Sequence, residues 1–281
     1  MHRVRNQPHG DLLKRIVVIS DTQIPFEDKR ALRNVIAFVG EYQPDEVIQI
    51  GDLVDYPAPS RWSAGTRAEF EGNVIRDSEY TKENFLEPLR AVYDGPVGIL
   101  EGNHDERPQK YLASRAPALA AQDSFYRFEN LLDFAAYDVR KLEPYYDFAP
   151  GWVAIHGHES AGLNQVAGRT AAAKARKAGV SVVMGHTHRL AISPESTGYG
   201  GKLRTIYGFE VGHLMDVRKA GYLKNGPANW QKGFGLFYVG KYGATPHAIP
   251  VEDDGSFVVE GQRYGKIKRG PKGRFAGKDA A

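Results

Sequence analysis

Five short apolar runs, each followed at once by a residue that can bind a metal ion, are the feature that most restricts how this sequence can fold. The runs cover residues 15–20, 46–50, 97–100, 152–155 and 180–184. Between the first two, residues 29–41 carry apolar side chains at helical spacing, which predicts the alternating strands and helices of an α/β fold. In such folds the loops after the carboxyl ends of the strands converge, so residues distant in sequence become neighbours.

The residues that follow these strands are carboxylates, an amide and imidazoles. They are Asp21, Asp52, Asn103, His156 and the pair His186 and His188. One Asp or His at a strand end means little, but such residues after all five strands are not expected by chance. The chain has no cysteine, which excludes disulfides, thiolate nucleophiles and zinc–cysteine sites. A metal ion would therefore be bound by oxygen and imidazole nitrogen.

Length and composition are those of a globular protein. The chain has 281 residues, of which 42% are hydrophobic and 25% charged, close to the averages for such proteins. It contains no apolar run of the roughly 18 to 20 residues that cross a bilayer, and residues 1–14 lack the apolar core of a signal peptide. We therefore expect a soluble, cytoplasmic protein with no membrane partner. Further helices are predicted over 78–93 and 167–178, and short strands over 203–207, 235–239, 247–251 and 256–259.

The charge distribution divides the chain into three expected regions: an N-terminal arm over 1–14, a main domain over 15–260 and a basic, glycine-rich tail over 261–281. The tail has seven Lys or Arg residues and one acid, Asp279, a net charge of +6 in a chain of net charge +3. Such a tail could steer the protein toward nucleic acid or another polyanion. It could equally be a disordered, solubilising end, because its composition cannot form a packed core.

The motifs at the strand ends resemble the five ordered motifs of the calcineurin-like metallophosphoesterases. They are Asp21-Thr22-Gln23, Gly51-Asp52-Leu53-Val54-Asp55, Gly102-Asn103-His104-Asp105, His156-Gly157-His158 and Gly185-His186-Thr187-His188. The resemblance covers about residues 15 to 190. It implies a four-layer α/β/β/α sandwich with two central mixed β-sheets and a metal centre at the strand ends. The first motif, with the Ile-Pro that follows it, is also similar to small phosphoesterases of bacteriophages and bacteria, and a phage protein would be located in the host cytoplasm.

The resemblance implies a centre of one or two divalent cations per chain, with Mn²⁺ favoured and Fe, Zn²⁺, Ni²⁺ or Mg²⁺ as alternatives. The first cation would be bound by Asp21, Asp52 and His188. The second would share Asp52 as a bridge and add Asn103, His156 and His186. Such cations neutralise a phosphate ester and supply hydroxide near neutral pH, so the implied reaction is hydrolysis by in-line attack of metal-bound hydroxide.

Three further residues of the motifs are expected to act beside the metal ligands. In the family the histidine at the position of His104 points at the substrate, where it protonates the leaving oxygen or stabilises the charge of the transition state. Asp105 could hold that imidazole protonated and correctly oriented, because a carboxylate raises the pKa of a nearby histidine. Asp55 is expected either to orient a metal ligand or to cap a turn.

The sequence departs from the family pattern at two positions. Gln23 stands where the family usually has histidine, which leaves three outcomes: Gln23 binds a cation through its oxygen, water takes the position, or one cation is tight and the other exchangeable. Tyr56 stands where many phosphatases carry an arginine that grips the phosphate. Three later arginines could replace it or could simply be surface residues: Arg61, Arg107 and Arg189.

The substrate is expected to be a phosphodiester of the cyclic-nucleotide or nucleic-acid type, because the usual arginine is absent and the tail is basic. A phosphomonoesterase and a DNA or RNA nuclease remain alternatives, as does a non-catalytic metal-binding scaffold. Two further groups are ambiguous. The aromatic residues between the second and third motifs could stack on a base or belong to the core: Trp62, Phe70, Tyr80 and Phe85. His213 and Trp230 lie in late loops that could line the site.

Overall fold

The computed structural model describes residues 13–120, 124–159, 162–220 and 226–265. The strands are β1 Lys14–Ile19, β2 Glu46–Ile50, β3 Val97–Leu100, β4 Val139–Lys141, β5 Tyr146–Ala149, β6 Trp152–Ile155, β7 Ser181–Met184, β8 Leu190–Tyr199, β9 Lys202–Val211, β10 Gly233–Gly240, β11 Gly243–Pro250, β12 Phe257–Val259 and β13 Gln262–Tyr264. The helices are α1 Lys29–Tyr42, α2 Arg67–Glu71, α3 Val74–Thr81, a π-helix Lys82–Leu86, α4 Glu87–Arg90, α5 Arg107–Arg115, α6 Pro117–Ala120, α7 Phe128–Leu131, α8 Arg169–Ala178 and a 3₁₀ turn Val217–Lys219.

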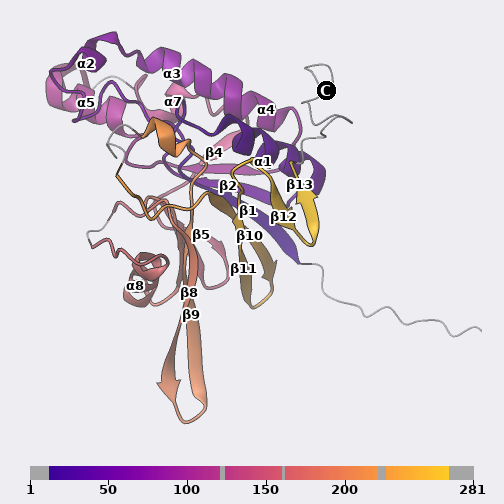
Figure 1. Cartoon of the computed structure of the whole chain (residues 1–281). Coiled ribbons are helices and arrows are strands. Elements are labelled where there is room, and N and C mark those ends of the chain that lie inside the picture. Colours follow the sequence, from indigo (N-terminus) through magenta and orange to yellow (C-terminus); the bar gives the residue numbers. More distant parts are fainter. Residues whose placement is uncertain (1–12, 121–123, 160–161, 221–225, 266–281) are drawn as a thin grey trace, which may run out of the picture.

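Two mixed sheets form the centre of the molecule (Figure 1). One has the strand order β11-β10-β1-β2-β3-β4 and the other the order β5-β6-β7-β9-β8. β1, β2, β3 and β4 run parallel. β10 pairs antiparallel with β1, and β11 pairs antiparallel with β10. In the second sheet β6, β7 and β9 run parallel, and β5 and β8 are antiparallel edge strands. The carboxyl ends of the parallel strands therefore share one edge of each sheet.

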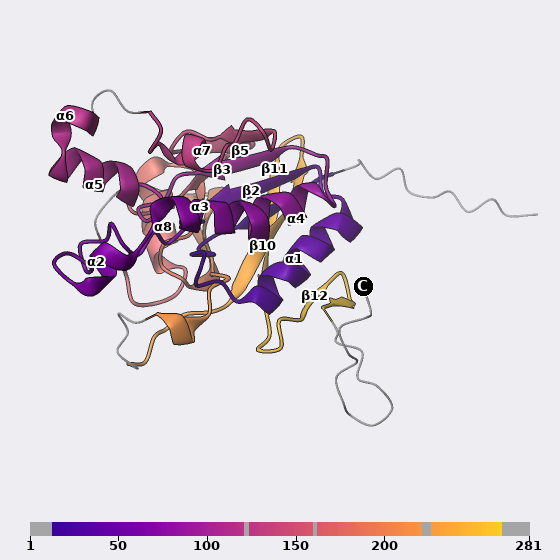
Figure 2. The ribbon, with the colours of Figure 1, turned by 90° about the horizontal axis from the view of Figure 1, so that it is seen from above.

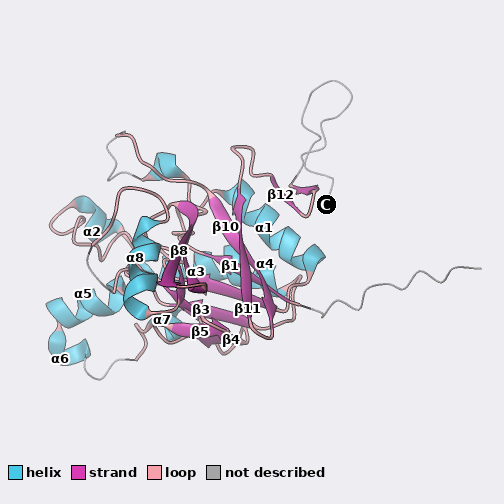
Figure 3. Ribbon diagram, turned by 90° about the horizontal axis from the view of Figure 1, so that it is seen from below, coloured by secondary structure: helices cyan, strands magenta, loops and turns pink. Residues whose placement is uncertain are grey.

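Successive side chains of a strand point to opposite faces of its sheet, so each sheet contributes to two cores. Val17 and Ile19 of β1 pack with α1 and α4 in an outer core, whereas Ile16 and Val18 face the core between the sheets. In β6, Trp152 and Ala154 belong to this central core, and the other two residues pack under α8. Figure 2 shows α1, α3 and α4 across the first sheet, and Figure 3, from below, shows α8 on the far side. The expected four-layer α/β/β/α sandwich is thus confirmed.

The predicted elements differ from the observed ones both before and after residue 190, since the sequence did not predict α2, β4, β5 or α5 to α7. The helix expected over 78–93 is a run of α3, π-helix and α4 over 74–90. β8 was not predicted, and the strand expected over 203–207 lies within the longer β9. These two strands form a hairpin that projects from the body of the molecule (Figure 1). Only the first residues of β8, including Leu190 and Ile192, pack against the central core, and the rest of the strand has no apolar face for a sequence pattern to reveal.

Both ends of the chain extend beyond the described part. The packed elements run from Lys14 to Tyr264. Residues 1–12 of the arm and 266–281 of the basic tail lie outside the described residues. Within the described ranges, no helix combines the length and apolarity needed to cross a membrane.

Candidate metal centre

The loops after five strands bring the candidate residues together where the two sheets meet. They are Asp21 and Gln23 after β1, Asp52 and Asp55 after β2, residues 103–105 after β3, His156 after β6, and His186 and His188 after β7. The Asp21 amide donates a hydrogen bond of 3.2 Å to the carbonyl of Gly51, which joins the first two loops. The His186 amide donates one of 2.9 Å to the Asp21 carboxylate, which joins the two sheets.

Two glycines allow the loops to approach this closely. A Cβ atom at Gly102 would lie 2.3 Å from both the amide nitrogen and Oδ1 of Asp52. Gly51 has a φ of +96°, and a Cβ atom there would lie 2.5 Å from Nδ1 of His156. The glycines that precede Asp52 and Asn103 in the motifs are therefore required by contact between neighbouring loops.

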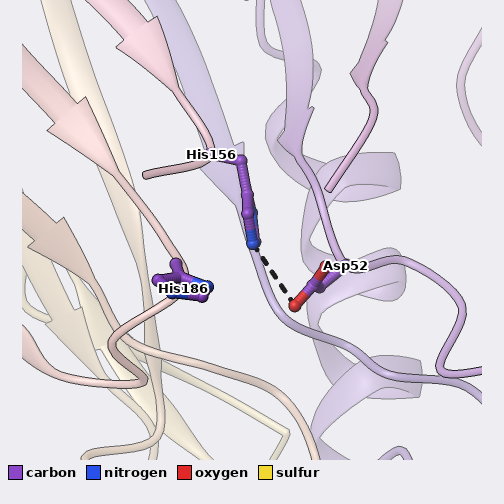
Figure 4. Close-up of side chains that lie close together, drawn as sticks. All are labelled: Asp52, His156 and His186. Carbon is purple, nitrogen blue, oxygen red and sulfur yellow. Dashed lines mark ion pairs between the residues drawn. The ribbon is translucent and has the colours of Figure 1, made fainter. Parts of the chain in front are cut away.

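Asp52, His156 and His186 form the centre of the site (Figure 4). Each offers a ligand atom, and these atoms all lie within 4.8 Å of one another. Nε2 of His156 lies 3.3 Å from Oδ2 of Asp52 and 3.2 Å from Oδ1 of Asn103. Nδ1 of His156 lies 2.9 Å from the Ile50 carbonyl and donates to it, so Nε2 is the atom left to face the carboxylate and the amide.

Asp21, Gln23 and His188 form a second group beside the first. Nε2 of His188 lies 3.1 Å from Oδ1 of Asp21 and accepts a hydrogen bond of 3.0 Å from the Gln23 amide. All three side chains are buried. The ring of Trp230 packs against His188, with ring centroids 4.3 Å apart.

Unpartnered acceptors at this second group test whether a cation fits. Oδ1 of Asp21 and Oε1 of Gln23 are buried without a hydrogen-bond donor among the described residues. A buried acceptor without a partner is costly, and a cation beside such oxygens removes that cost. Together with the imidazoles, these oxygens make a mixed oxygen and nitrogen donor set that suits Mn²⁺, Fe, Zn²⁺ or Ni²⁺ better than Ca²⁺. The residues present therefore fit a divalent cation.

Five of the candidate ligand residues have an uncommon backbone conformation. Asp21, Gln23, Asp52, His186 and His188 all have positive φ, between 47° and 64°. This left-handed region is uncommon for residues other than glycine, and it occurs where the surrounding structure imposes it, often at functional sites. The conformation supports a role for Gln23 in the site, because four expected ligands share it.

Electrostatics at the centre favour a positive charge. Burial opposes the charged form of His156, but the Asp52 and Asp21 carboxylates outweigh it and raise the pKa of His156 to about 10. Burial, together with the charge on His156, lowers the pKa of His186 to about 4. Although burial opposes ionisation of Asp52, the neighbouring histidines hold its pKa well below the ordinary value. The two carboxylates thus favour a positive charge at this centre.

His104 lies at the edge of this centre in contact with Asp55 and Arg107. Its Nδ1 lies 2.6 Å from Oδ1 of Asp55, to which it donates. Its Nε2 lies 3.7 Å from Oδ2 of Asp52 and accepts a 3.0 Å hydrogen bond from Arg107. Arg107 also donates a bond of 2.6 Å to the Asp55 carbonyl. Both ring nitrogens of His104 are therefore hydrogen-bonded, and Nε2 is the one that lies on the side of Asp52.

Asp105 does not hold the His104 imidazole, contrary to the sequence-based expectation. Its carboxylate accepts hydrogen bonds of 2.8 Å from the amides of Val54 and Gly102. Burial and the nearby Asp52 charge raise the pKa of Asp105 well above its ordinary value. Asp105 therefore ties the second and third motif loops together, and Asp55, expected to orient a metal ligand or cap a turn, is the carboxylate that orients His104.

The three candidate arginines differ in what they contact. Arg107 contacts His104 directly, and Arg189 lines a hollow of about 290 Å³ together with Asp52 and His186. Arg61 lies over the ring of Trp62, 4.7 Å from its centroid. Tyr56 is fully buried, and its hydroxyl bonds Ser78 at 2.8 Å. Position 56 thus points into the core, and Arg107 is the arginine that contacts the motif histidine.

One buried residue near the centre, Glu210, carried no sequence signal. Glu210, at the end of β9, is fully buried. It accepts hydrogen bonds from the amides of Thr170 and Ala171 and from the Thr187 hydroxyl. It thereby fastens the loop that carries His186 to the start of α8. The sequence predicted a strand only over 203–207, and glutamate is usually exposed, so the burial of Glu210 was not predicted.

The ambiguous aromatic residues divide into two groups. Phe85 is fully buried and Tyr80 packs against the outer core, so both are structural. Trp62 and Phe70 are 70% and 80% exposed. His213 and Trp230 do lie at the site, with ring centroids 5.5 Å and 4.3 Å from that of His188.

Comparison with known proteins places these motifs in a family. The sequence model of the family described as calcineurin-like phosphoesterase matches residues 14–190. The chain is 50% identical to the Gene 54 protein of Mycobacterium phage L5 over 250 residues, which are 89% of this chain and 98% of that protein. The Gene 54 protein of Mycobacterium phage D29 is also 50% identical, over 88% of this chain and 97% of its own.

Similar solved structures are more distant. Vacuolar Protein Sorting 29 from Cryptosporidium parvum is 14% identical with a TM-score of 0.43, and the match covers 90% of this chain and 95% of that one. Yfce, a phosphoesterase from E. coli, is 16% identical with a TM-score of 0.36, over 79% and 87% of the two chains. The family match spans more than half of the chain and includes every motif described above. This protein therefore belongs to the calcineurin-like phosphoesterase family.

Proposed function

We propose that the protein hydrolyses phosphodiesters of the nucleotide or nucleic-acid type at this centre, as a metal-dependent phosphoesterase. The observation that carries the proposal is the cluster of Asp52, His156 and His186, whose ligand atoms lie within 4.8 Å of one another beside His104. Membership of the family supports metal-dependent hydrolysis of a phosphoester. The choice of a diester is our own inference, and it rests on the residues described next.

The ligands proposed for one or two divalent cations, Mn²⁺ foremost, are the residues of the two buried groups. They are Asp21, Gln23 and His188 on one side, and Asn103, His156 and His186 on the other, with Asp52 between them. Bound there, a cation neutralises phosphate charge and makes a bound water acidic enough to supply hydroxide near neutral pH. Gln23 offers its unpartnered Oε1, a weaker ligand than the imidazole usual in the family.

His104 is proposed as the general acid. Asp55 accepts the Nδ1 proton at 2.6 Å and so fixes the ring, which leaves Nε2 toward the site. When a substrate phosphate takes over the Arg107 guanidinium, Nε2 is free to carry a proton. Nε2 can then donate its proton to the leaving oxygen as the ester bond breaks.

Arg107 is proposed to bind a non-bridging phosphate oxygen. It lies 3.0 Å from Nε2 of His104, so a phosphate that reaches this histidine also reaches the guanidinium. This contact replaces the arginine that many phosphatases carry where this chain has the buried Tyr56. We prefer a diester because a cavity of about 740 Å³, lined by His104 and Arg107, leaves room for a second ester group beside the phosphate.

Hydrolysis of bis-p-nitrophenyl phosphate in the presence of Mn²⁺ tests the proposal, with p-nitrophenyl phosphate as the monoester comparison. We expect the diester to be the better substrate, and we expect Asn103→Ala and His186→Ala to lower its kcat/KM by about a hundredfold, as loss of a metal ligand should. His247→Ala, at an exposed histidine of β11, is the matched control. Equal rates in the His186→Ala and His247→Ala proteins would refute the centre, and faster turnover of the monoester would refute the substrate class.

A further inference from the structure

A cavity of about 740 Å³ opens beside the metal centre. One wall is the segment that precedes α2, including Arg61 and Trp62, and the other is α5, including Lys110 and Arg115. Figures 1 and 2 both show α2 and α5 side by side at this end of the molecule. We call this space the Trp62 cavity. Its volume is within the range of pockets that hold small organic ligands.

The Trp62 cavity is continuous with the metal centre. His104 and Arg107 line it, and the same two residues line the smaller hollow that contains Asp52, His186 and His188. Trp62 also lines both spaces. A phosphate bound between His104 and the ligand cluster would therefore extend one of its ester groups into the cavity.

The side chains that face the Trp62 cavity are basic and aromatic. Four cationic residues line it and no acidic residue does. Three of the four have acidic neighbours that do not line the cavity: Asp55 lies 3.3 Å from Arg107, Glu106 pairs with Lys110, and Glu69 lies 3.9 Å from Arg115. Arg61 contacts the Trp62 ring and has no acidic partner among the described residues. The cavity thus offers positive charge to an anion.

Trp62 is exposed on a segment that local hydrogen bonds hold in place. Its side chain is 70% exposed, although tryptophan is highly buried on average. The Trp62 amide donates to Ser60 Oγ at 3.2 Å, and the Ser63 hydroxyl bonds the Pro57 carbonyl at 2.6 Å. Opposite, the Tyr111 hydroxyl bonds Glu69 at 2.7 Å, which fixes α5 to α2. An exposed aromatic ring held in place is suited to stacking on a planar ligand.

From these features we propose that the Trp62 cavity binds the nucleotide portion of the substrate. The base stacks on Trp62, and phosphates that flank the base contact Arg61, Lys110 or Arg115. Aromatic rings among basic side chains are the combination by which proteins bind single-stranded nucleic acid and nucleotides. This inference rests on the proposed function and narrows its substrate to esters that carry a nucleobase.

Two chromogenic diesters test the inference. The p-nitrophenyl ester of thymidine 5′-phosphate carries a base, and methyl p-nitrophenyl phosphate does not. We expect the wild-type protein to have the higher kcat/KM for the nucleotide ester, and we expect Trp62→Ala to lower the ratio of the two kcat/KM values about tenfold, as loss of one base–aromatic stack should. The ratio is informative because both esters use one centre, so lost folding or metal lowers both rates together.

The control variant is Tyr242→Ala. Tyr242 is 88% exposed and lies under Lys241, with 5.1 Å between the ammonium and the ring centroid, so this pair resembles Arg61 and Trp62 at a distant position. The ratio should stay at the wild-type value in this variant. A ratio unchanged in both variants, or no preference for the nucleotide ester in the wild type, would overturn the inference while leaving phosphodiester hydrolysis standing.

Binding separates the two proposals if neither ester is hydrolysed, which would refute the proposed function. Fluorescence anisotropy with labelled thymidine tetranucleotide then tests the cavity alone. About tenfold weaker binding by the Trp62→Ala protein than by the Tyr242→Ala protein supports nucleotide recognition, and equal binding by the two refutes it. Competition by thymidine 5′-phosphate and by the tetranucleotide tells a free nucleotide from a polynucleotide as the better ligand.

Discussion

Raising the pH from 6 to 8 should tighten the binding of Mn²⁺ to the apo protein about a hundredfold, because the cation must displace a proton from His156. The pKa of this histidine is about 10 in the apo protein, since two carboxylates outweigh the effect of burial. At pH 7 this histidine therefore carries the proton. His186, with its pKa near 4, is already neutral and releases none.

The sign of the linked stability follows from the same shift. A folded-state pKa raised above the ordinary value of 6.5 means that the proton stabilises the apo fold fully below pH 6.5 and less as the pH rises toward 10. A bound cation replaces it. The stabilisation that a fixed excess of Mn²⁺ gives to the fold should therefore be larger at pH 8 than at pH 6, by about 2.7 kcal/mol for one proton over two pH units.

Isothermal titration calorimetry with Mn²⁺ measures this directly. Titrations at pH 7 in two buffers of different ionisation enthalpy should show close to one proton released per ion bound at the tight site. The His156→Asn protein should bind more weakly and release none. Proton release near zero in the wild type, with an affinity that does not change between pH 6 and 8, would show that His156 does not face the cation.

Three other predictions concern the surrounding residues. Gln23→His should bind Mn²⁺ more tightly, about tenfold, because imidazole is the stronger ligand; unchanged affinity in calorimetry would show that this side chain does not face the ion. Asp55→Asn should lower kcat for bis-p-nitrophenyl phosphate by about ten- to a hundredfold, because His104 loses the carboxylate that fixes its ring; an unchanged kcat would contradict this. Glu210→Ala should cost about 2 to 4 kcal/mol in urea unfolding by leaving buried donors unpaired, whereas Glu195→Ala, at a surface ion pair, should change little; equal effects would remove the role assigned to Glu210.

The positions of the metal centre residues were predictable because the candidate ligands lie just after apolar runs that form strands. Apolar runs such as 46–50 and 152–155 mark buried strands, and the polar residue after each marks the carboxyl end. The structure brings Asp52, His156 and His186 together as this reasoning requires. The order of the two sheets and their layering came from the family resemblance, since alternation alone establishes only an α/β class.

The contacts made by individual carboxylates were not predictable in the same way. Asp55 and Asp105 are both near His104 in the fold, and sequence spacing favoured the adjacent residue. The structure shows the opposite assignment, because the Asp105 side chain turns back to the amides of Val54 and Gly102. The direction of a side chain in a loop depends on the backbone conformation, such as the positive φ at Asp52. The residue type alone does not predict that conformation.

Elements with little buried surface were also missed. Beyond Leu190 and Ile192, β8 has no apolar face because the hairpin it forms with β9 projects from the body, so its pairing there is set by the backbone ladder with β9. Glu210 belongs to the same strand pair, and its burial depends on the approach of α8 from elsewhere in the chain. Long-range packing of this kind leaves no local pattern.

The central claim is that buried carboxylate, amide and imidazole groups from five loops share a cationic centre. Anomalous diffraction from crystals soaked in Mn²⁺ tests it most directly. We predict a peak within coordinating distance of Asp52, His156 and His186, with a weaker one beside Asp21 and Gln23. Manganese bound elsewhere on the protein, with no anomalous density at Asp52, would contradict the account.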